Sequence, residues 1–107
     1  MQKLDVVEKL FPLVLSGEKT STIRFREQRI QLGPMVYWCE GDSTETSIVW
    51  VKRCTDMPLS EATAFLGKAQ EWPVDVMLED MRAHYPGIRL TDIVQVVEHY
   101  TPEESLP

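Results

Sequence analysis

Apolar residues recur at the three- and four-residue spacing of an amphipathic helix in two stretches, residues 9–16 and 74–84. Pro12 fits the first turn of the earlier helix, where backbone N–H groups have no helical partner, and Gly17 supplies its C-terminal cap. A short third helix is predicted over residues 60–66 because a glycine follows it directly. The two apolar stripes consist of Leu10, Leu13 and Val14, and of Val74, Met77, Leu78 and Met81.

Five runs rich in β-branched and aromatic residues predict strands, at residues 4–7, 20–25, 35–39, 46–53 and 92–100. The second, third and fourth runs follow one another across turn residues, including a turn at residues 40–43, and therefore predict an antiparallel meander. Helices precede and follow this meander, so the pattern favours an α+β fold with a small, mixed and partly closed β-barrel and flanking helices.

Alternation along the second of these strands divides its side chains between two faces. Ile23 and Phe25 are expected to point into the core, whereas Thr20, Thr22 and Arg24 would face a cavity or solvent. This strand therefore presents a polar row that is suited to binding.

The chain length indicates one domain over residues 1–107, and the acidic, proline-containing segment at about residues 101–107 is expected to be a frayed tail. Neither a membrane-spanning run nor a secretory signal is apparent, so a cytoplasmic location without membrane contact is expected. Cys39 and Cys54 are expected to be reduced and buried, and no spacing of ligands predicts a metal. Trp50, which lies among aliphatic residues, is expected to be structural.

Seventeen acidic and eleven basic residues give a net charge of -6, which excludes a protein that coats long nucleic acid by neutralising phosphates. Lys19, Arg24, Arg26 and Arg29 nevertheless cluster within a short stretch. Such a cluster predicts either a local phosphate or carboxylate site or a solvated strand edge that charge protects from aggregation.

The octet Gly17–Arg24, preceded by an apolar helix and followed by a glycine turn and an aromatic strand, resembles the signature of the ASCH domain family. Residues 85–87 and the last strand match the same family pattern more weakly. The resemblance implies a PUA-like barrel of a kind associated with RNA, formed here by a single ASCH-like domain.

Within that family the chain is similar to the small bacterial amidohydrolases that remove the acetyl group from acetylcytidine. The resemblance implies a catalytic set of Lys19, Thr22 and Glu71, with Glu79 or Glu61 as alternative carboxylates. It requires no cofactor and no metal, and a monomer that acts on a small nucleoside is expected.

Cleavage of an acylated amine needs a nucleophile, a base, an acid and donors for the oxyanion. Thr22 offers a hydroxyl, while Lys19 serves either as a base, if its amine is neutral, or as a cation that stabilises the oxyanion. Because the two are three residues apart, Lys19 must lie in the turn before the strand to reach the same side. The residues expected to bind substrate are Thr20, Arg24, Arg26 and Trp72, the last by stacking on a base.

Two other functions use the same residues. An RNA-binding module would contact phosphates through the basic cluster and hold bases on aromatic rings. A ribonuclease would use lysine or arginine to stabilise a pentavalent phosphate, although the sequence offers no obvious catalytic histidine because His84 and His99 fit a helix end and a strand.

Overall fold

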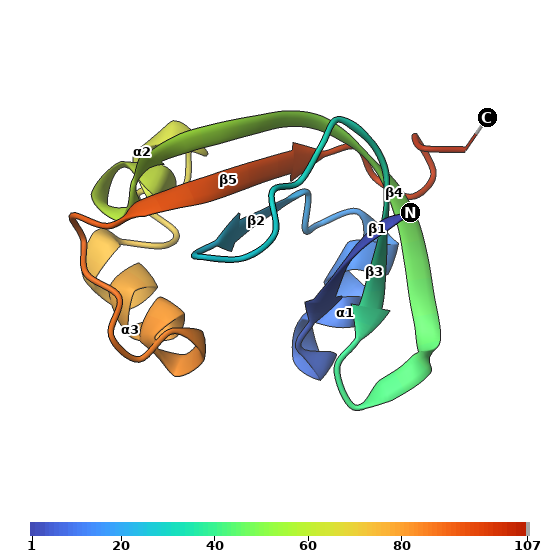
Figure 1. Ribbon diagram of the computed structural model, residues 1–107, viewed down its shortest axis with the longest axis horizontal. Coiled ribbons are helices and arrows are strands. Elements are labelled where there is room, and N and C mark those ends of the chain that lie inside the picture. Colours follow the sequence, from blue (N-terminus) through green and yellow to red (C-terminus); the bar gives the residue numbers. More distant parts are fainter. Residues whose placement is uncertain (107) are drawn as a thin grey trace. The chain divides into compact units, whose positions relative to one another are not determined.

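The computed structural model describes residues 1–106. Every predicted helix and strand is present, and the last helix begins and ends at the predicted residues (Figure 1). The predicted α+β class is therefore confirmed. In chain order the elements are β1 (Gln2–Val6), the 3-10 helix η1 (Glu8–Leu10), α1 (Phe11–Ser16), β2 (Ser21–Arg24), β3 (Gly33–Cys39), β4 (Asp42–Pro58), the 3-10 helix η2 (Leu59–Glu61), α2 (Ala62–Phe65), α3 (Val74–His84) and β5 (Ile93–His99).

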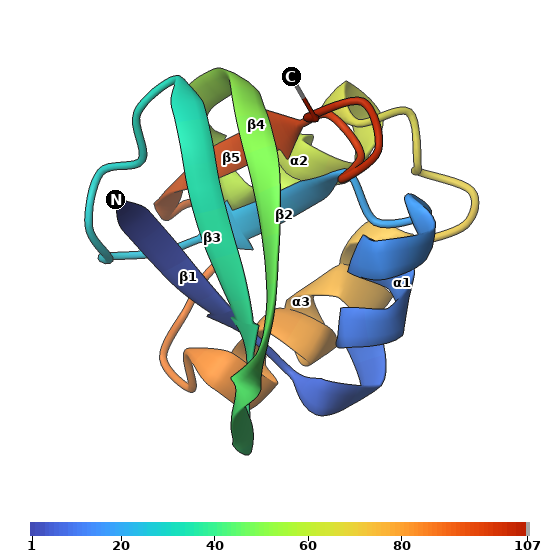
Figure 2. The ribbon, with the colours of Figure 1, turned by 90° about the vertical axis from the view of Figure 1, so that its right-hand side faces the viewer.

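The five strands are hydrogen-bonded in the order β1-β3-β4-β5-β2. β1 runs parallel to β3 and β3 runs antiparallel to β4, so these three strands lie side by side (Figure 2). The predicted meander is wrong for β2, which pairs with β5 and not with β3. The loop of residues 25–32 that joins β2 to β3 is too long to impose a hairpin, and a distant strand supplies the partner.

The hairpin between β3 and β4 is tighter than the predicted turn at residues 40–43. β3 ends at Cys39 and β4 begins at Asp42, so only two residues form the connection. Gly41 occupies the left-handed region with a φ of 90°, a conformation that glycine adopts without a Cβ clash. β4 then continues well beyond the predicted end, as far as Pro58.

Contacts between Cα atoms divide the chain into two compact units. Unit 1 comprises residues 1–22, 28–54 and 97 onward, and unit 2 comprises residues 23–27 and 55–96. Each unit contains its own cluster of buried apolar side chains. In unit 2, Met77 and Met81 of α3 pack with Val94 and Val96 of β5, while Val74 and Leu78 pack against this core from partly buried positions.

The core of unit 1 contains the inward side chains of β1, β3 and β4, with Phe11 and Val14 of α1. On β4, Val49 and Val51 are fully buried, whereas Ile48 is 54% exposed and Trp50 is 49% exposed. Trp50, expected to be structural, therefore lies on the partly exposed face of the strand. Strand alternation assigns only every second residue to the buried face, and the two valines occupy those positions.

The segment after β5 begins with a hydrogen-bonded turn. The Thr101 N–H donates to the Glu104 side chain at 2.9 Å, and the Glu104 N–H donates to Oγ1 of Thr101 at 3.1 Å, which is a reciprocal capping box. Ser105 accepts a hydrogen bond from the Trp50 N–H at 2.8 Å. The capping box closes the last turn, and the bond from Trp50 joins this turn to β4 within unit 1.

Cys39 is buried and Cys54 is half-buried, and both are free thiols. The prediction that both cysteines are buried holds for Cys39 and is wrong for Cys54. Across residues 1–106, no helix is both long and apolar enough to cross a membrane.

Candidate functional site

The octet begins where α1 ends. Gly17 has a φ of 86°, and its N–H donates to the Val14 carbonyl at 3.2 Å. The Lys19 N–H then donates to the Leu13 carbonyl at 2.9 Å. Lys19 therefore lies in the connection before β2, as the spacing between this lysine and Thr22 requires.

The Lys19 side chain folds back over the start of β2. Its Nζ donates a hydrogen bond to the main-chain carbonyl of Ser21 at 2.6 Å. Thr22 follows directly and is only 7% exposed, while Ser21 and Ile23 are also buried. The prediction that Thr22 lies on an open face is wrong because both faces of β2 are covered.

Sequence reasoning missed the role of His99, which lies beside this segment. The His99 N–H donates to the Thr20 carbonyl at 2.9 Å, and the imidazole is fully buried. Nδ1 lies 2.8 Å from the Tyr100 carbonyl, and Nε2 lies 2.9 Å from the Tyr37 hydroxyl. A carbonyl only accepts, so Nδ1 carries the proton and the Tyr37 O–H donates to Nε2.

This arrangement keeps His99 uncharged. Burial lowers the pKa of His99, and the positive charges of Lys19 and Lys52 lower it further, against the opposing effect of the bond to the Tyr100 carbonyl. The fully buried Tyr37 is a hydrogen-bond donor in unit 1 and has no surface on which a base could stack.

The lowered pKa of His99 predicts a specific loss of stability in acid. The unfolded imidazole has a pKa near 6.5 and the folded one a lower value, so below about pH 6.5 the unfolded state binds a proton that the native state does not. We expect the contribution of His99 to be complete above that pH and to fall by up to about 1.4 kcal/mol per pH unit below it. Urea unfolding of wild type and His99→Gln between pH 4 and 8 measures this, and curves that stay parallel across the whole range would contradict it.

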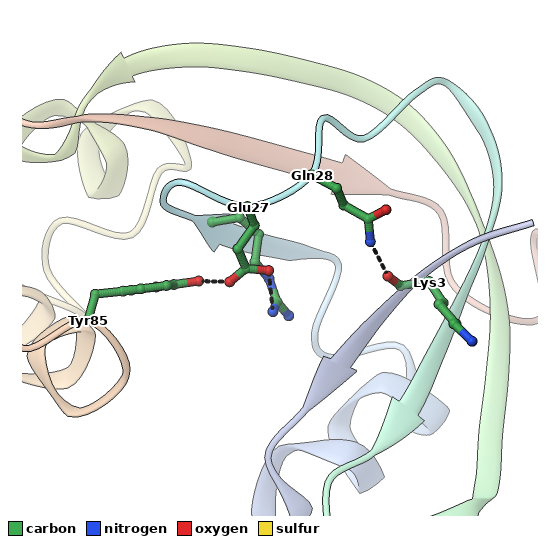
Figure 3. Close-up of polar contacts among 5 residues, drawn as sticks. Lys3, Glu27, Gln28 and Tyr85 are labelled. Atoms are coloured by element: carbon green, nitrogen blue, oxygen red, sulfur yellow. Dashed lines mark hydrogen bonds and ion pairs between the residues drawn. The ribbon is translucent and has the colours of Figure 1, made fainter.

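Unit 2 contains a second polar cluster at the end of β2. Glu27 accepts a hydrogen bond from the Tyr85 hydroxyl and forms an ion pair with Arg24 at 3.5 Å (Figure 3). The Arg24 side chain is only 12% exposed. Sequence reasoning assigned no role to Glu27, and it used Tyr85 only as a helix end and as part of the weak family match at residues 85–87.

Burial raises the pKa of Tyr85 to about 12, and the bond to the Glu27 carboxylate raises it in the same direction. Tyr85 therefore stays protonated at neutral pH and acts as a donor. Its ring meets Phe25 edge to face, with centroids 5.8 Å apart.

The remaining predicted site residues lie at different places in unit 2. Glu71 is exposed in the turn before α3 and has no hydrogen bond or ion pair within residues 1–106. The alternatives Glu61 and Glu79 are also exposed, on η2 and α3. Trp72 is half-buried, and its indole N–H donates to the Asp80 carboxylate at 2.8 Å.

Each basic residue of the predicted cluster makes a different local interaction. Lys19 bonds to a main-chain carbonyl, Arg24 pairs with Glu27, and Arg26 lies over the Phe25 ring at 4.7 Å. Arg29 lines a shallow groove of unit 1 with Lys52. Among the described residues, no group of three or more histidine, cysteine, aspartate or glutamate side chains is placed to hold a metal ion.

Two solved structures share this fold. A serine-to-alanine variant of the ZmASCH protein from Zymomonas mobilis superposes with a TM-score of 0.67 at 11% identity, covering 91% of this chain and 65% of that one. A tyrosine-to-phenylalanine variant of the same protein gives a TM-score of 0.63 at 12% identity, covering 92% and 67%. The chain thus spans about two thirds of the length of these neighbours.

At this identity the likeness concerns the fold alone, and it confirms the ASCH-type, PUA-like α+β fold that the octet predicts. No protein-family model matches the sequence, and no curated protein matches it.

Proposed function

We propose that this protein is an amidohydrolase that removes the acetyl group from the exocyclic amine of acetylcytidine-type nucleosides, with Lys19 and Thr22 at its centre. The observation that supports the proposal most is the position of Lys19. Its amine is held over the start of β2, 2.6 Å from the carbonyl of the residue that precedes Thr22. The spacing of these two residues would otherwise place them on opposite sides of a strand.

In this reaction the Thr22 hydroxyl oxygen attacks the acetyl carbonyl and passes its proton to a base. The carbon–nitrogen bond then breaks, and the exocyclic amine of cytidine leaves with a proton from a general acid. Water hydrolyses the resulting acetyl-threonine ester, which releases acetate and restores the hydroxyl. No metal takes part in the proposed steps.

Lys19 is the base if its amine is neutral, and otherwise stabilises the oxyanion as a cation. Thr22 is only 7% exposed, so little water surrounds its hydroxyl and electrostatic interactions there are strong. We assign the general acid to Glu71, with Glu79 and Glu61 as the carboxylates to compare with it. Trp72, Arg24, Arg26 and Thr20 remain the proposed substrate-binding residues.

The proposal is tested by incubating purified, chelator-treated protein with acetylcytidine and following the release of cytidine and acetate. We expect turnover that a chelator does not reduce. If Glu71 is the acid, Glu71→Gln will lose activity, whereas Glu79→Gln and Glu61→Gln will keep it.

Absence of turnover would overturn the proposal. Binding of single-stranded RNA that weakens steeply as salt rises would then support a module that uses Lys19, Arg24, Arg26 and Arg29. Cleavage of that RNA would instead support a ribonuclease.

A further inference from the structure

Unit 2 carries a groove on its surface. It has a volume of about 770 Å³, and its lining includes Phe25, Arg26, Glu27, His84, Tyr85 and Arg89. A groove of this size matches those that hold small organic ligands. Its walls combine two aromatic rings with charges of both signs, so the charge balance decides what it binds.

The carboxylates of the groove are already neutralised by groups of the same unit. Glu27 accepts the Tyr85 hydroxyl and pairs with Arg24. Asp92 accepts the Arg89 N–H at 2.8 Å and pairs with the Arg89 guanidinium at 3.7 Å. Neither carboxylate is available to attract a cation.

Arg26 is different from the other charged residues of the groove. Its guanidinium lies over the Phe25 ring at 4.7 Å, and within residues 1–106 it has no carboxylate partner. Arg26 is exposed and lines the groove. The charge that the groove leaves uncompensated is therefore positive.

The backbone at Arg26 supports a role in binding. Its φ is 55°, the only positive φ at a non-glycine position among the described residues. Side chains other than glycine rarely adopt this conformation, and such strain concentrates at functional sites. Glycine adopts a positive φ with less strain than any other residue. Arg26 therefore occupies a position whose backbone conformation disfavours an arginine.

We propose that this groove binds a small phosphomonoester, of the size of a nucleoside monophosphate, through the Arg26 guanidinium. Arginine pairs with phosphate oxygens through two parallel N–H donors, and the stacking on Phe25 holds the planar group in place. Phe25, Tyr85 and Pro86 also line the groove and give the organic part of the ligand an apolar surface. Arg26 is also a proposed substrate-binding residue of the deacylation, but binding of the phosphomonoester requires no turnover at Lys19 and Thr22.

The test compares cytidine 5′-monophosphate, cytidine and inorganic phosphate by calorimetry and by amide chemical shifts of labelled protein. We expect the monophosphate to bind more tightly than either component and to shift the amides of residues 25–27 and 84–87. Arg26→Ala should weaken binding by about 10-fold or more, as the loss of a charge-assisted hydrogen bond predicts. Arg26→Lys keeps the positive charge but loses the two parallel N–H donors of the guanidinium, and it should retain part of the affinity.

Two controls separate the loss of binding from a loss of stability and from the loss of a positive charge elsewhere on the protein. Arg26→Gly should lose binding without a lower Tm, because glycine suits a φ of 55°. Lys52→Ala removes a cation that lies over the Tyr100 ring in unit 1, at 5.0 Å, and should leave binding unchanged.

Equal affinity for cytidine and its monophosphate, or unchanged affinity in Arg26→Ala, would overturn the proposal. Loss of binding in Lys19→Ala with retention in Arg26→Ala would also overturn it, because the anion would then bind at the octet. Failure of the deacylation assay alone would leave this result unaffected.

Discussion

Thr22→Val is expected to lower kcat/KM for acetylcytidine by about 10³-fold, within the range that loss of a group acting directly in proton or acyl transfer produces. Valine keeps the β-branching and approximate volume of threonine, so the substitution removes the hydroxyl without opening a cavity at the buried β2 position. Such a factor corresponds to about 4 kcal/mol of transition-state stabilisation. Initial rates at several substrate concentrations measure it directly.

Matched variants establish that the hydroxyl is the cause. Thr22→Ser keeps a hydroxyl and should retain measurable turnover, while Lys19→Ala should lose about as much activity as Thr22→Val because the two act as a unit. Lys9→Ala removes an exposed lysine ahead of α1 and should leave the rate unchanged. Full activity in a folded Thr22→Val protein would remove Thr22 from the mechanism.

Gly17→Ala should destabilise the protein by about 2 to 4 kcal/mol. Gly17 has a φ of 86°, which costs an L-residue about 1 to 2 kcal/mol. A Cβ there would also lie 2.9 Å from Cγ2 and 3.3 Å from Cβ of Thr101, so the last turn of unit 1 would have to shift. Urea unfolding followed by circular dichroism gives the change in the free energy of unfolding.

The chain offers a control that separates the two causes. Gly67 has a φ of 71°, but a Cβ built on it meets no atom within 4 Å. Gly67→Ala should therefore show the conformational penalty alone. Thr101→Ser removes the offending methyl while keeping the hydroxyl that caps Glu104, and should restore part of the stability of Gly17→Ala. Equal losses at Gly17 and Gly67 would contradict this account.

Local signals in the sequence predicted the elements well. The apolar stripe and the Tyr85 boundary gave α3 its correct limits, and Gly17 ended α1 with the expected left-handed conformation. The position of Lys19 before β2 also followed from local spacing. These features depend on residues within one or two helical turns of each other, where sequence patterns act directly.

Features that depend on distant partners were not predicted. β2 pairs with β5, and the buried bond between Tyr37 and His99 joins positions 62 apart in the sequence. Neither pairing leaves a local pattern. The capping box of Thr101 and Glu104 did leave one, a threonine followed three residues later by a glutamate, which the acidic and proline-containing tail obscured.

The distribution of tryptophans between the two units gives each unit an optical reporter. Unit 2 contains a single tryptophan, Trp72, whose indole N–H is bonded to Asp80, whereas unit 1 contains Trp38 and the half-exposed Trp50. In a Trp72→Phe protein the emission comes only from unit 1. Comparison of its fluorescence melting curve with that of the wild type would therefore show whether the two cores melt at one temperature or at two.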